Sequence, residues 1–168
     1  GRVLGPRGGF AVGALGLVVS SMMWGGFGPW TAFQALAIGW VGVGAGLIPA
    51  RLKAAPRLEV GILALYGAVS SYVFGALMNL WFWPLAIGAG TSISLAGDEG
   101  LLANLGRFAV YCLTTSTLTW DSVRAVTTVV TLALIGVAAL KALRRVSALR
   151  GLDGEVLGFR VMEHERVG

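Results

Sequence analysis

Two long stretches without a charged residue constrain this chain more than any other feature. No Asp, Glu, Lys or Arg occurs from Gly8 to Ala50, and none occurs from Val60 to Gly97. A helix that crosses the hydrocarbon of a membrane needs about 20 consecutive, mostly apolar residues. The first stretch is long enough for two such crossings, and the second is long enough for one crossing followed by a loop.

The composition excludes a soluble protein. Of 168 residues, 56% are hydrophobic and 12% are charged, whereas soluble domains have about 45–50% apolar and about 25% charged residues. Too little polar surface remains to cover a soluble globule, so soluble enzymes and nucleic-acid-binding modules are excluded. The 26 glycines have no triplet period, and we interpret them as sites of close helix packing in lipid.

We predict an all-α, polytopic transmembrane helix bundle in residues 1–150. Four spans are expected near residues 9–24, 31–48, 60–80 and 121–140, followed by a polar cytoplasmic tail at 151–168. The breakers in Gly25–Pro29 mark the turn between the first two spans. Asp121 or Ser122 is the expected N-cap of the last span.

The positions of the basic residues predict the orientation. They cluster before the first span, between the second and third, and after the fourth: Arg2 and Arg7; Arg51, Lys53 and Arg57; Lys141, Arg144, Arg145 and Arg150. Because cytoplasmic loops are rich in Lys and Arg, both ends and the loop 50–57 are predicted to be cytoplasmic. The chain is therefore expected to be a multi-pass protein of the cell membrane, with lipid and not nucleic acid as a partner.

Several kinds of chemistry lack candidate residues. The chain has one cysteine, Cys112, and one histidine, His164 in the tail, so we predict no disulfide, no zinc site, no cofactor and no catalytic residue. It has no phosphate-binding loop for ATP. Glu59 and Asp121 are the only acidic residues close to the spans, and both are expected at span edges. A carrier of this kind is either passive or takes its energy from a partner protein.

Aromatic and amide side chains gather at the predicted outer ends of the spans. Five of them are candidate substrate-binding residues for a flat or ring-shaped solute: Trp30, Gln34, Asn79, Trp83 and Tyr111. The turn 25–29 and the connection 83–120 are expected to act as lids. The alternatives are an interfacial aromatic belt for the tryptophans and interhelical hydrogen bonds for the amides.

Small residues and hydroxyl residues form further patterns that have two interpretations. Glycine or serine recurs every four residues in three spans: Gly1, Gly5, Gly9 and Gly13; Gly42 and Gly46; Gly67, Ser71 and Gly75. These faces either dock a partner subunit or pack within this chain, and we favour packing. The hydroxyls of Thr114–Thr119 either bind a ligand or bond to the helix backbone, and we favour the backbone.

The strings F-G-P-W (27–30) and M-N-L-W-F-W-P (78–84), with similarity over residues 1–149, resemble the actinobacterial substrate-specific S component of energy-coupling factor (ECF) transporters. The resemblance implies a six-helix membrane protein that captures a vitamin. It also implies docking on a transmembrane coupling subunit with two ATPase subunits. The chain would then be an N-terminally truncated, non-enzymatic member, and the opening GRVLGPRGGF has no signal-peptide pattern. Cobalamin or a precursor is the expected substrate in this branch. The alternative is a structural or assembly subunit without a ligand.

Overall fold

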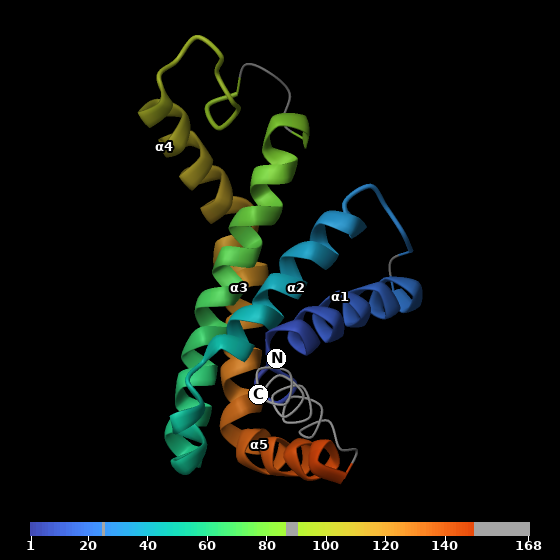
Figure 1. Ribbon diagram of the computed structural model, residues 1–168. Helices are drawn as coiled ribbons and strands as arrows, with labels where there is room; N and C mark the ends of the chain where they lie inside the picture. The colour runs from blue at the N-terminus through green and yellow to red at the C-terminus, as the bar shows by residue number, and fades with distance from the viewer. Residues whose placement is uncertain (25, 87–90, 150–168) are drawn as a thin grey trace, which may run out of the picture.

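The computed structural model of this chain describes residues 1–24, 26–86 and 91–149 (Figure 1). The predicted tail at 151–168, with His164, lies outside the described residues. Within the described ranges the regular structure is helical and contains no strand, which confirms the all-α prediction. In chain order the elements are α1 (Gly5–Trp24), α2 (Thr31–Leu47), the 3-10 helix η1 (Ala50–Ala54), α3 (Pro56–Ala86), α4 (Leu101–Cys112), the π-helix η2 (Leu113–Asp121) and α5 (Ser122–Leu149).

Glycines bring α1 and α2 together as a hairpin (Figure 1). A methyl group added at Gly9 would collide with the carbonyl oxygen of Gly42, and one added at Gly42 would collide with the carbonyl oxygen of Gly9. This confirms that the small-residue faces of these two helices pack within the chain. The proposed four-glycine face is wrong, however, because α1 begins only at Gly5, whose φ is +73° and whose surroundings are open.

The small-residue face of α3 packs on the last part of the chain. An added methyl group at Gly67 would lie 2.6 Å from Cγ2 of Thr128 in α5, and one at Gly75 would overlap the carboxylate of Asp121 in η2. Helices α3 and α5 consequently run side by side for much of their length (Figure 1). This face, too, is used for packing within the chain.

The last three elements follow one another without a break from residue 101 to residue 149. The expected N-cap at Asp121 or Ser122 is therefore wrong, because the chain is already helical before both residues. Hydroxyl groups bond to the backbone along η2: Thr115 donates to the carbonyl oxygen of Tyr111 (2.6 Å), and Ser122 donates to that of Thr117 (2.6 Å). These bonds confirm the structural interpretation for Thr115 and accompany the wider π-helical turn.

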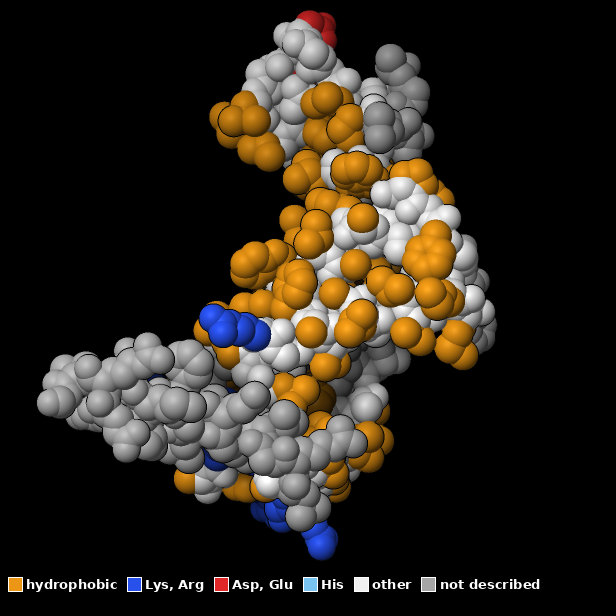
Figure 2. Space-filling model, turned by 45° about the vertical axis from the view of Figure 1, so that its right-hand side comes forward, with side chains coloured by type: hydrophobic (Ala, Val, Ile, Leu, Met, Phe, Trp, Pro, Cys, Tyr) orange, Lys and Arg blue, Asp and Glu red, His pale blue; other side chains and the backbone are white. Residues whose placement is uncertain are grey.

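Two helical segments are long and apolar enough to cross a membrane. The most apolar 18-residue stretch has a mean hydropathy of 1.7 within Pro56–Pro84 and of 2.1 within Leu101–Ala148, while Thr31–Leu47 is a shorter apolar helix. In the most apolar parts of the two segments only 28% and 11% of the residues are buried inside the chain, so most of their apolar side chains face outward (Figure 2). Both are therefore candidate membrane helices, and the four-span bundle remains a prediction.

Candidate functional site

A chain of polar side chains lies where α3 crosses η2 and the start of α5, and we call it the α3–η2 polar network. Asn79 donates from Nδ2 to Oγ of Ser116 (2.7 Å), and Ser116 donates to Oδ2 of Asp121 (2.8 Å). Arg124 donates to Oδ1 of Asp121 (2.9 Å) and to the carbonyl oxygen of Ser71 (3.4 Å). The network thus joins an amide, a hydroxyl and an ion pair on two candidate membrane segments.

Local packing explains how a carboxylate fits between these helices. Gly75 has no side chain, so the Asp121 carboxylate lies directly against α3. The guanidinium of Arg124 lies 4.9 Å from the ring centroid of Phe74, in a cation–π contact. Asp121 is only 1% exposed, and a buried carboxylate is costly unless it is paired and hydrogen-bonded. The arrangement supplies both the charge partner and the hydrogen bonds.

Three of the five predicted site residues lie where α3 meets α4. Asn79 and Trp83, one turn apart on α3, are 8% and 6% exposed, and Tyr111 of α4 is also buried. The ring of Trp83 lies 5.1 Å from that of Phe108, and its Nε1 donates to the carbonyl oxygen of Ile93 (2.7 Å). These residues form part of an interior that continues into the polar network.

The other two predicted residues lie on α2, or just before it, on another side of α3. The ring of Trp30, which is 41% exposed, lies 6.1 Å from the ring of Phe82. Gln34, one turn later, is half-buried. In Figure 1, α3 runs between α2 and α4 at this end. The five residues therefore form two groups, one on the α2 side of α3 and one on the α4 side.

Asp121 and Arg124 were not among the predicted site residues, and Ser116 was predicted only as part of the hydroxyl run Thr114–Thr119, for which backbone bonding was favoured. Asp121 and Arg124 stand three residues apart and are the only charged residues from 108 to 140, and this spacing places both on one face of a helix. That pair, opposite the small-residue face of α3, was the signal that could have identified them. It was assigned instead to the edge of a span.

The predicted lid 83–120 is largely helical, because it contains the end of α3, all of α4 and most of η2. Its described loop, residues 91–100, is fastened to α4. The side-chain oxygen of Asn104 accepts from the backbone N–H of Ala96 (2.9 Å), and its amide nitrogen donates to the Ala96 carbonyl oxygen (2.8 Å). Arg107 forms an ion pair with Glu99 and donates to the carbonyl oxygen of Thr91 (3.1 Å). These bonds hold residues 91–99 over the end of the α3–α4 pair.

A second ionic cluster lies at the opposite end of α3. Glu59 is 0% exposed, and its Oε1 accepts from Arg2 (2.5 Å) and from Arg144 of α5 (2.5 Å). Arg2 also donates to the carbonyl oxygen of Ile48 (2.6 Å). This cluster ties the N-terminal turn, the end of α2, α3 and α5 together, so Glu59 has a clear structural role.

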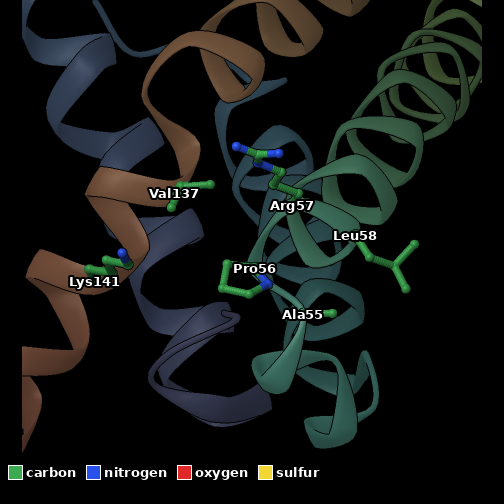
Figure 3. A pocket seen from close by; sticks show the side chains of 6 residues that line it. All are labelled: Ala55, Pro56, Arg57, Leu58, Val137 and Lys141. Carbon is green, nitrogen blue, oxygen red and sulfur yellow. The ribbon is translucent and has the colours of Figure 1, made fainter.

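Several hollows lie away from the five predicted residues. One of about 260 Å³ lies between α2 and α3 and is lined mainly by apolar side chains, among them Trp40, Tyr66 and Phe74. Another, of about 750 Å³, lies between the start of α3 and α5 (Figure 3). In the described part of the chain, no three His, Cys, Asp or Glu residues group as metal ligands.

Comparison of the chain with family models, with curated proteins and with solved structures gave no match.

Proposed function

We propose that this chain is the membrane-embedded substrate-binding subunit of an ECF-type transporter, which captures a vitamin-like solute. In this proposal it is a multi-pass protein of the cell membrane with four spans and cytoplasmic ends. The other three subunits of the transporter would be its partners: one transmembrane coupling subunit and two ATPase subunits. The proposal requires no enzymatic activity of this chain, which lacks a phosphate-binding loop.

The α3–η2 polar network is the observation that carries the proposal. Ionisable and amide side chains within apolar membrane helices are costly, and they usually face a bundle interior that forms a solute pathway or binding site. Asn79, Ser116 and the Asp121–Arg124 pair lie together on two candidate membrane segments. The π-helix η2 that holds Ser116 and Asp121 adds support, because π-turns occur frequently at functional sites.

Each side chain has a role that follows from its chemistry. Asn79 and Ser116 can exchange their mutual hydrogen bond for bonds to a polar solute. Trp83 is buried against Phe108 and would have to exchange this contact for one with a solute on the α4 side, whereas Trp30, Gln34 and the neighbouring aromatic rings would contact a solute on the α2 side. A ligand large enough to reach both groups would have to span the end of α3. Cobalamin or a precursor is therefore a suitable first compound for a binding test.

A structural or assembly subunit is the second candidate, and one observation favours it. Asn79, Ser116, Asp121 and Arg124 hydrogen-bond to one another, so the network is complete without a ligand. Such a network could serve only to fix how α3 packs on η2.

Ligand binding distinguishes the two candidates. The chain, purified in detergent, is tested for thermal stabilisation by a panel of vitamins and for association with an ECF coupling subunit and its ATPases. Stabilisation by one compound, together with association, supports the transport proposal. A folded chain that is stabilised by no compound and associates with no such subunit contradicts it and favours the structural candidate.

A further inference from the structure

Among the residues that the structure describes, positive charge is in excess at the end where α3 begins. Glu59 is the only acidic residue within residues 50–59 and 141–149, and it is already paired with Arg2 and Arg144. The same two segments contain five other cationic residues: Arg51, Lys53, Arg57, Lys141 and Arg145. Figure 2 shows Lys and Arg side chains in the lower half of the molecule and acidic ones at its upper tip. An anionic ligand would balance this charge.

The pocket of about 750 Å³ lies within this basic end. Ala55, Pro56, Arg57 and Leu58 line it from the start of α3, and Val137 and Lys141 line it from α5 (Figure 3). Arg57 and Lys141 thus approach one space from two helices. Both are exposed, and neither forms an ion pair within the described part of the chain.

The backbone adds to the attraction for an anion. The first N–H groups of a helix have no partner inside the helix, and this end of the helix carries a partial positive charge. The first turn of α3, a helix of 31 residues, forms one side of the pocket. Its first residue, Pro56, has no N–H, and the N–H of Glu59 bonds to the Ala55 carbonyl oxygen (2.9 Å), which leaves the N–H groups of Arg57 and Leu58 as donors. Backbone donors and two cationic side chains from different helices therefore surround the same space.

We infer that this pocket binds the phosphate headgroup of an anionic membrane lipid. Basic pockets between membrane helices on the cytoplasmic side are suited to such headgroups. The other lining residues are apolar, and Leu58 is exposed. The acyl chain of a lipid would gain apolar contacts beside the pocket, whereas free phosphate would gain none. The inference rests on the proposed membrane location of the chain and is independent of solute binding.

The test compares two double variants of the full chain. Arg57→Gln/Lys141→Gln removes both cations of the pocket. Arg51→Gln/Lys53→Gln is the matched control, since it removes the same charge from the same end but outside the pocket. Native mass spectrometry in mild detergent measures 1:1 binding of phosphatidylglycerol, of phosphatidylcholine and of inorganic phosphate. Thermal unfolding checks that each variant is folded.

The parent is expected to bind phosphatidylglycerol in preference to phosphatidylcholine. The pocket variant is expected to bind it about 10- to 30-fold more weakly, and the control variant within about 2-fold of the parent. An equal loss of phosphatidylglycerol affinity in both variants would show that the pocket is not the binding site, because the effect would then come from the total positive charge. Inorganic phosphate that competes at equal concentration would overturn the assignment to a lipid. A parent chain that binds a solute but does not prefer phosphatidylglycerol would contradict this inference alone. A parent chain that prefers phosphatidylglycerol but binds no solute would contradict only the transport proposal.

Discussion

Gly75 of α3 lies so close to Asp121 of η2 that a single added methyl group would overlap the carboxylate oxygens. The carboxylate can occupy this position only because residue 75 has no side chain. Since Asp121 also binds Ser116 and Arg124, the contact links the packing of two candidate membrane helices to their shared polar network.

The substitution Gly75→Ala should therefore destabilise the chain by about 1–3 kcal/mol, the usual cost of adding a methyl group to a tightly packed site. Gly61→Ala is the matched control, because this glycine of the same helix has open space around it. Thermal or denaturant unfolding in detergent provides the measurement. Equal stability of the two variants would show that Asp121 does not pack against α3 as described.

The substitution Arg124→Gln should cost about 1–3 kcal/mol, because Asp121 stays buried and loses its charged partner. In the double variant Asp121→Asn/Arg124→Gln the loss should be smaller than the sum of the single losses, since no unpaired charge remains. Arg145→Gln, at an exposed position in the same helix, serves as the control. Additive effects in this cycle would contradict a direct interaction between the two side chains.

Solute binding should depend on the α4 side of α3. Asn79→Ala removes an amide from the polar network and should weaken binding about 5- to 150-fold, the equivalent of about 1–3 kcal/mol. Trp83→Ala should weaken it as well, while Trp40→Ala, at an exposed tryptophan of α2, should have little effect. Affinity is measured by titration calorimetry with the compound found in the vitamin panel. If folded Asn79→Ala and Trp83→Ala variants bind as the parent does, these residues serve packing only.

The orientation can be tested by labelling single cysteines. Ala54 and Ser92 are exposed and lie near opposite ends of α3, which at about 1.5 Å per residue is long enough to cross a membrane. In a Cys112→Ser background, Ser92→Cys should react with an impermeant thiol reagent in intact cells, and Ala54→Cys should react only after permeabilisation. Labelling of Ala54→Cys in intact cells would reverse the predicted orientation.

Much of the helical organisation could be predicted because its causes are local. Uncharged stretches and Gly-Pro breakers predicted spans at 31–48 and 60–80, and the structure has helices at Thr31–Leu47 and Pro56–Ala86. Packing within the chain was also the favoured interpretation for the glycines of the first two spans, and it is correct for Gly9, Gly13, Gly42 and Gly46 but not for Gly5. These features depend on hydropathy and on the positions of glycine, which has no side chain. Both can be read from a short segment of sequence.

The candidate site depended on contacts between distant segments. The sequence by itself determined that the chain is apolar and helical, and that it contains Asn79, Asp121 and Arg124. An Asp beside a Ser has the same local pattern whether it caps a helix or lies within one, so the N-cap prediction failed at Asp121. Only the tertiary structure decided that α4, η2 and α5 continue past it, because Gly75 makes room for its carboxylate and Ser116 and Arg124 satisfy it. The tertiary structure also separates Trp30 from Trp83, because α2 and α4 pack on different sides of α3. No local sequence pattern specifies which helix packs on which side.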